Sequence, residues 1–195
     1  MTRNRIVNYN KNMKATQVLI DEHSGLMVIL KVLEKINSQI SQDSQFNIDH
    51  VDEIIEFFQV FLDKCHHSKE EIYLFPSIEA LGTDSDRQLI KEALDDHKNA
   101  RIFASEMEDS IAAYKEGRKA EIKEFSKNTV SYISLISRHI QKENTVIFIR
   151  ANELISSEEQ NEMVTEFEEI EKDVIGVGRH EEFHIMVDEL KKIYL

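Results

Sequence analysis

The chain has 195 residues, enough for one domain with a sizeable core and few for two. Its 24 Lys and Arg against 37 Asp and Glu give a net charge of −13, which disfavours nucleic acid and anionic membranes as partners. The single Cys excludes an internal disulfide, and no apolar run suits a signal peptide or a membrane span. Five Gly and one Pro leave little turn chemistry for an all-β fold. Together these features lead us to expect a soluble, cytoplasmic, mostly helical protein.

The N-terminal half predicts a leader and two helices. Residues 1–13 form a polar leader, and apolar residues at helical spacing predict a first helix over 14–40. A polar connector follows, after which Asn47 or Asp49 is expected to cap a second helix. Pro76 is expected to stop or kink that helix, because proline clashes with the preceding turn.

Two more long helices follow. The third is expected to begin after a cap at Asp84 or Ser85 and to run to about Tyr114, where Gly117 breaks it. The fourth is expected over 120–151. Short polar connectors between such helices favour antiparallel neighbours.

The C-terminal part predicts a helical extension. Ser156 or Ser157 is expected to cap a fifth helix, and Gly176 and Gly178 separate it from a short last helix. Residues 14–195 therefore predict one all-α domain: an antiparallel up-down-up-down four-helix bundle with a C-terminal helical extension.

An internal repeat relates the two halves of the predicted bundle. Residues 66–75 read HHSKEEIYLF and residues 139–148 read HIQKENTVIF, so both contain His-x-x-Lys-Glu. The segments DEH, ending at His23, and DDH, ending at His97, precede the two repeats by nearly the same distance. The repeat predicts pseudo-two-fold symmetry about a shared centre.

The spacing within the repeat has a chemical reason. Residues four apart share one helix face, so each His-x-x-x-Glu can direct two ligands to one place. Imidazole with carboxylate suits iron, manganese or zinc. Four His and two Glu exceed one tetrahedral zinc and fit two metals bridged by two carboxylates. The predicted ligands are His23, His66, Glu70, His97, His139 and Glu143.

A second register competes on the second helix, because His67 and Glu71 are also four apart. The apolar stripe leads to His66, whereas the face behind His67 is more polar. His67 is therefore expected to be exposed, with a place beside the ligands as the alternative. Lys69 and Lys142, each directly before a predicted ligand Glu, are expected to extend to solvent.

The ordered set of His and Glu resembles the hemerythrin-like, or HHE, cation-binding family. The segments FLDKCHHSKEEIYLFP and SRHIQKENTVIF are similar to its two signature helices. The resemblance implies a four-helix bundle around a non-haem di-iron centre with an oxide or hydroxide bridge. Glu70 and Glu143 would bridge the irons, the four histidines would be terminal ligands, and manganese or zinc could substitute.

The chain departs from the oxygen-carrying members of that family. Those have a second His one turn from the first on the third helix, where this chain has Ala93 and Arg101. They also use an Asp five residues after the fourth-helix His, where this chain has Glu143 at four. We therefore expect a centre with one imidazole fewer, reactive at its His97 end.

The segment HEEFH, from His180 to His184, matches the pattern of zinc peptidases. Few residues follow it, which leaves little room for a third ligand and a cleft, so a chance match is expected. The alternative is that His180 or His184 supplies the missing imidazole.

The expected function is sensing of, or reaction with, oxygen, peroxide or nitric oxide, or the handling of iron. The alternatives are a di-iron oxidase or peroxidase and a repair protein for iron centres. Reversible oxygen carriage is disfavoured by the missing imidazole. The expected partner is a small diatomic or peroxide ligand, rather than nucleic acid or a membrane.

Overall fold

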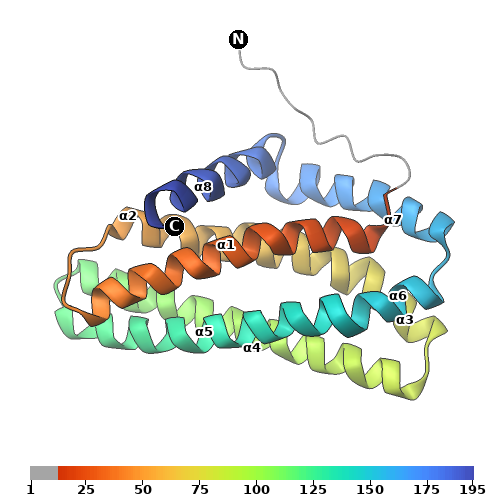
Figure 1. Ribbon diagram of the computed structural model, residues 1–195, viewed down its shortest axis with the longest axis horizontal. Coiled ribbons are helices and arrows are strands. Elements are labelled where there is room, and N and C mark those ends of the chain that lie inside the picture. Colours follow the sequence, from red (N-terminus) through yellow and green to blue (C-terminus); the bar gives the residue numbers. More distant parts are fainter. Residues whose placement is uncertain (1–12) are drawn as a thin grey trace, which may run out of the picture.

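The protein is a bundle of long antiparallel helices with two further helices along one side (Figure 1). The computed structural model describes residues 13–195, and no strand occurs among them. The predicted leader, residues 1–13, lies outside the described residues except for Met13. The predicted all-α class and up-down-up-down arrangement are confirmed.

Four helical arms make the bundle, two of them composite. The first arm is α1 (Ala15–Ser41) and the third is α4 (Asp84–Lys115). The second comprises α2 (Ile48–Phe57), η1 (Phe58–His67), η2 (Glu70–Leu74) and α3 (Phe75–Leu81). The fourth comprises η3 (Lys119–Glu121), α5 (Ile122–Lys142), η4 (Glu143–Ile147) and α6 (Phe148–Leu154).

Side-chain caps start the helices where the sequence offers short polar residues. The Asn47 side chain accepts the N–H of Asp49 at the start of α2, as predicted. Before α4 the cap is Thr83, one residue earlier than predicted, because Thr83 and Asp86 satisfy each other's backbone N–H in a capping box. Ser156 forms a second such box before α7.

Of the expected stop or kink at Pro76, the stop is wrong. The helical arm continues through this residue to Leu81, and Pro76 lies in the first turn of α3, directly after the π-helical segment η2. A proline in a first helical turn is tolerated, because its missing N–H has no partner to lose there. Further π-helical segments, η1 and η4, lie in the middle of the second and fourth arms.

The core consists of two apolar clusters with a polar layer between them. Leu26, Phe58 and Tyr132 belong to one cluster, and Leu19 and Phe75 belong to the other. Each arm thus changes from one cluster to the other at about its middle. The predicted ligands lie at this change, so the fold surrounds them with apolar side chains on both sides.

The C-terminal extension packs along α1. It comprises α7 (Ser157–Ile170), η5 (Glu171–Ile175) and α8 (Arg179–Tyr194). Gly176 and Gly178 have φ of 92° and 88°, a region that favours glycine, and they form the turn before α8. Phe183 and Leu190 of α8 are buried in the core.

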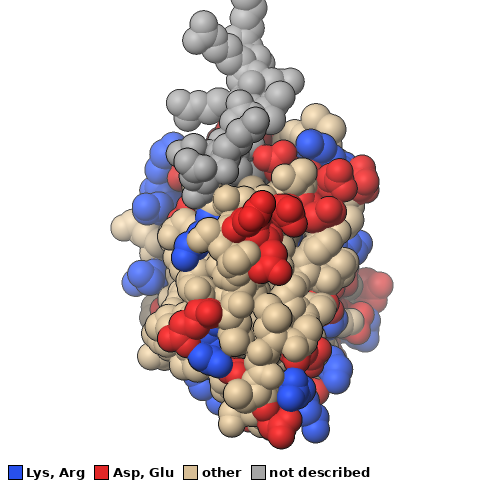
Figure 2. All heavy atoms as spheres, turned by 90° about the vertical axis from the view of Figure 1, so that its right-hand side faces the viewer, with Lys and Arg blue, Asp and Glu red and all other residues tan. Residues whose placement is uncertain are grey.

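The outside of the molecule is strongly charged. Asp and Glu side chains gather in patches on the end of the bundle that Figure 2 shows, with Lys and Arg between and beside them. Among the described residues, no helix has the length and apolar character needed to cross a membrane.

Candidate metal centre

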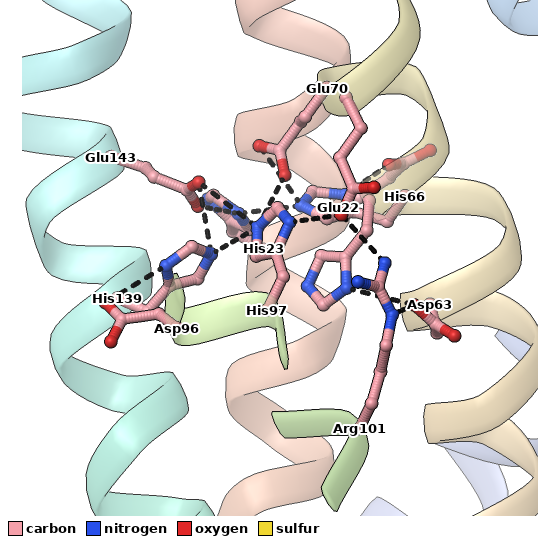
Figure 3. A network of polar contacts seen from close by, with 12 residues as sticks. Glu22, His23, Asp63, His66, Glu70, Asp96, His97, Arg101, His139 and Glu143 are labelled. Carbon is pink, nitrogen blue, oxygen red and sulfur yellow. Dashed lines mark hydrogen bonds and ion pairs between the residues drawn. The ribbon is translucent and has the colours of Figure 1, made fainter. Parts of the chain in front are cut away.

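Four imidazoles meet as two pairs in the middle of the bundle (Figure 3). The Nε2 atoms of His23 and His66 lie 3.0 Å apart, and those of His97 and His139 lie 3.1 Å apart. The first pair joins α1 to η1, and the second joins α4 to α5. All four rings are buried. Each pair therefore directs two donor nitrogens to one place.

Two buried glutamates connect one pair with the other. The carboxylate oxygens of Glu70 lie 3.6 Å from the Nε2 of His66 and 3.4 Å from that of His97. Those of Glu143 lie 3.2 Å from the Nε2 of His23 and 3.1 Å from that of His139. Each carboxylate thus offers one oxygen to each pair.

The four carboxylate oxygens have no hydrogen bond of good geometry, although Glu70 and Glu143 are fully buried. Burying an ionised carboxylate without such partners is costly, so a group of opposite charge is needed there. The donor set therefore fits two cations that share both carboxylates.

A fifth imidazole belongs to the same cluster. The His67 side chain is 1% exposed, and its ring stacks on that of His97 with centroids 3.7 Å apart. Neither of its nitrogens has a hydrogen-bond partner. Ligand atoms within 4.8 Å of one another define two groups. The three-imidazole half contains His67, His97 and His139 with Glu70; the two-imidazole half contains His23 and His66 with Glu70 and Glu143.

The expectation that His67 is exposed is therefore wrong, as is the expectation of a centre one imidazole short. The physical reason is η1, a π-helical segment that ends at His67. A π-helical turn holds more residues than an α-helical turn, so the α-helical spacing behind the expectation does not apply at His67. The His97 end, expected to be under-coordinated, contains three imidazoles.

Acceptors outside the centre hold three of the imidazoles by their Nδ1 atoms. An acceptor there fixes the proton on Nδ1 and leaves the Nε2 lone pair directed inward. The distances are 2.9 Å from His23 to Asn144, 2.7 Å from His66 to Glu22 and 2.7 Å from His97 to Glu71. Arg101 in turn contacts Glu71 at 2.7 Å and Asp63 at 2.6 Å (Figure 3).

The ionisation of the two glutamates differs because their neighbours differ. Burial and the adjacent Glu143 raise the pKa of Glu70 well above its ordinary value. Burial acts on Glu143 in the same direction, but the charge of His139 holds the pKa of Glu143 well below its usual range. Burial would lower the pKa of His139, yet Glu143 and Asp96 raise it to about 9. Without metal, the centre thus contains a protonated Glu70 and a His139–Glu143 ion pair.

Three further imidazoles of the centre are neutral. Burial lowers the pKa of His66 to about 4, and it lowers the pKa of His67 and His97 in the same direction. A neutral imidazole has the free lone pair that a metal needs. The low pKa values therefore leave these side chains ready to act as ligands near neutral pH.

The expectation that Lys69 extends to solvent is wrong. Its side chain is fully buried, and its ammonium contacts Glu22 and, at 2.7 Å, Glu171. The buried carboxylate of Glu22 and the partly buried carboxylate of Glu171 thus take the place of water around the charge. Lys142 remains partly exposed and contacts Glu92 at the surface.

The HEEFH segment does not reach the centre. His180 lies in a separate group with Glu22 and Glu171, and its Nε2 is 3.7 Å from Glu22. Neither His180 nor His184 is in either half of the centre, so the alternative in which one of them supplies a missing ligand is wrong.

Comparisons with known proteins found curated relatives and a matching family model. Curated proteins of Mycobacterium bovis and of two Mycobacterium tuberculosis strains, each described as uncharacterized, are 23% identical to this chain. The matches cover 92% of this chain and 68% of each relative. No solved structure matches significantly. Residues 14–151 match the model of the hemerythrin HHE cation binding domain, which is most of the chain, and the chain therefore belongs to the hemerythrin HHE cation-binding family.

Proposed function

We propose that the protein binds two iron ions at this centre and uses them to bind or sense a small ligand such as oxygen, nitric oxide or peroxide. The observation that carries the proposal is the placement of the carboxylate oxygens of Glu70 and Glu143. Each glutamate presents one oxygen to each imidazole pair, at 3.1–3.6 Å. Manganese and zinc accept the same donors and could substitute.

The proposed ligands are the six predicted residues together with His67. Glu70 and Glu143 would bridge the metals, and the imidazoles would be terminal. Iron in such a centre supplies electrons to a bound oxidant or a coordination position to a neutral diatomic molecule. The residues of the chain place the donors, exclude water and hold the protons described above.

The unequal halves suggest where a small ligand would bind. Two bridging carboxylates and three imidazoles would give five donors to one metal, whereas the two carboxylates and two imidazoles would give the other only four. The two-imidazole half is therefore the less saturated one. Phe148 stacks on His23 with ring centroids 5.5 Å apart and Phe75 stacks on His97 at 5.7 Å, so an aromatic ring shields each half.

Reversible oxygen binding becomes a second candidate because of His67. A carrier needs a crowded, dry centre with one reactive position, and the fifth imidazole restores that condition. A di-iron oxidase or peroxidase, a repair protein for iron centres and an iron-handling protein remain alternatives. The net charge of −13 supports a small molecule, rather than nucleic acid or a membrane, as the partner. The single buried Cys65 is compatible with a cytoplasmic location.

The first experiment measures metal content. The protein is purified without added metal, reconstituted with iron(II) under nitrogen, desalted and analysed. We expect about two irons per chain, as the two groups of donors require. The His66→Ala variant should bind less, whereas the control His50→Ala should bind as much as the wild type. Wild-type preparations that never exceed one metal per chain would contradict the proposal.

A second experiment distinguishes the uses of the centre. The reduced, iron-loaded protein is cycled between air and vacuum while its absorption spectrum is recorded. Recovery of the reduced spectrum supports reversible binding, whereas permanent oxidation within minutes supports a sensor or an enzyme. Turnover with peroxide and with nitric oxide then separates an enzyme from a sensor.

A further inference from the structure

A second buried cluster lies on the far side of His66 from the metal centre. It consists of Glu22, Lys69, Glu171 and His180, and we refer to it as the Lys69 cluster. The Lys69 ammonium lies between the two carboxylates, in contact with Glu22 and 2.7 Å from Glu171. The Nε2 of His180 lies 3.7 Å from Glu22 and 3.8 Å from Glu171.

The cluster contains its own cation. The ammonium is placed where a metal bound by Glu22, Glu171 and His180 would have to lie, so an additional metal would have to displace it. His180 is 8% exposed, and neither ring nitrogen has a hydrogen bond of good geometry. The imidazole thus faces both carboxylates from slightly beyond hydrogen-bond distance.

One member of the cluster connects it directly to the centre. Glu22 uses one carboxylate oxygen for Lys69 and the other to accept the Nδ1–H of His66 at 2.7 Å. Whatever withdraws negative charge from Glu22 weakens it as an acceptor for His66. A weaker acceptor at Nδ1 makes the imidazole a poorer donor at Nε2.

The cluster also joins two parts of the chain. Glu22 and Lys69 lie within the matched residues 14–151, whereas Glu171 is the first residue of η5 and His180 lies in the first turn of α8. The C-terminal extension thus contributes a carboxylate and an imidazole to the surroundings of a predicted metal ligand.

We propose that Glu171 and His180 are positioning residues, through which the C-terminal extension sets the donor strength of His66 and hence the properties of the two-imidazole half. This inference rests on the proposed function for its consequence at the metal. Glu171 shares the Lys69 ammonium and so leaves negative charge on Glu22. His180 acts in the opposite sense, because its polar N–H edge attracts the negative charge of the Glu22 carboxylate and leaves less of it for His66.

The two positions therefore predict opposite effects. In Glu171→Gln, the ammonium should favour Glu22, weaken the Glu22–His66 hydrogen bond and raise the reduction potential of the loaded centre. Iron in the two-imidazole half should bind more weakly, by on the order of tenfold, as for other changes in residues that hold a metal ligand. In His180→Leu, Glu22 should accept more strongly from His66 and the potential should fall. A general loss of stability would shift the reduction potential of both variants in the same direction.

The test begins without metal. The ¹⁵N shifts of the His66 ring in the metal-free full-length protein report the strength of its hydrogen bond to Glu22. We expect them to move in opposite directions in Glu171→Gln and His180→Leu, and to stay unchanged in the control Glu169→Gln, which alters an exposed glutamate two residues away. Glu22→Gln provides the reference for a lost carboxylate acceptor.

The potentials and iron affinities of the same variants complete the test. Unchanged His66 shifts and an unchanged potential in both variants, with only a lower melting temperature, would overturn the inference. The same would follow if both variants shifted in one direction. If the wild type binds no pair of metals, the proposed function fails, while the metal-free shifts still decide whether the extension acts on His66.

Discussion

The ring of His67 stacks on the ring of His97, with centroids 3.7 Å apart and planes inclined by 14°. The contact joins the second arm of the bundle to α4, and it lies beside the His97–His139 pair. In the oxygen-carrying members of the family, from which the sequence departs, a second histidine on the third helix supplies an extra imidazole. Here the second arm supplies it instead, so the imidazole count comes from a different helix.

The first prediction concerns His67. Replacing it by Ala should leave the three-imidazole half with two imidazoles and weaken metal binding there. Metal analysis after desalting should give clearly fewer than two irons per chain. His50→Ala is the control, because His50 lies near the start of α2 and bonds to Tyr194. Full metal content in the His67→Ala protein would mean that His67 packs beside the centre without binding metal.

The second prediction concerns Glu70, whose pKa is raised by burial and by Glu143. Glu70→Gln replaces a carboxyl that resists ionisation with a neutral group of the same shape. The metal-free variant should therefore melt at a higher temperature than the metal-free wild type at alkaline pH. It should also lose metal binding, because one bridging carboxylate is gone. Calorimetry with and without metal measures both effects, and equal melting temperatures of the metal-free proteins would contradict the assignment.

The fold followed from the sequence because its signals are local. Apolar spacing and short polar connectors predicted the four arms, and Asn47 and Ser156 were among the predicted caps. The cap before α4 was misplaced by one residue, because Thr83, Asp84 and Ser85 all suit the position and the capping box between Thr83 and Asp86 selects Thr83.

The centre was predicted incompletely for a different reason. The repeat correctly brought six side chains together, since each His-x-x-x-Glu keeps its two side chains on one side of its arm. It failed at His67 because that spacing does not describe a π-helical segment. Lys69 and the His180 group depend on the packing of the extension against α1, and no local pattern encodes that contact. The adjacent pair of histidines was the one available signal.

The third prediction concerns the pH dependence of stability without metal. The imidazoles of His66, His67 and His97 have lowered pKa values in the folded chain. Below about pH 6.5 the unfolded chain therefore binds more protons at these side chains than the folded chain does. Stability should fall as the pH drops from there towards about 4, the pKa of His66. His139 has a raised pKa, so its contribution is complete below 6.5 and is lost as the pH rises through about 9.

Thermal unfolding of the metal-free protein should therefore show its highest melting temperature near neutral pH, with lower values on both sides. Glu70 acts in the same sense as His139, because its raised pKa also favours the protonated folded state. In His139→Gln the loss on the alkaline side should become smaller. A melting temperature that rises steadily up to pH 9 would show that His139 is not held in its charged form.

The last prediction concerns protons released by metal binding. Near pH 7 the metal-free centre holds one proton on Glu70 and one on His139 that must leave before both side chains can act as ligands. Loading with manganese(II) under nitrogen should therefore release about two protons per chain, which a pH indicator in weakly buffered solution measures. Near pH 9.5 the release should be smaller than near pH 7, because His139 has then lost most of its proton, and apparent affinity should rise with pH over the same interval. The metal-free protein alone, taken through the same mixing step, provides the baseline. Metal binding without proton release near pH 7 would mean that Glu70 and His139 are already deprotonated in the metal-free chain, and that the buried carboxylates are neutralised in some other way.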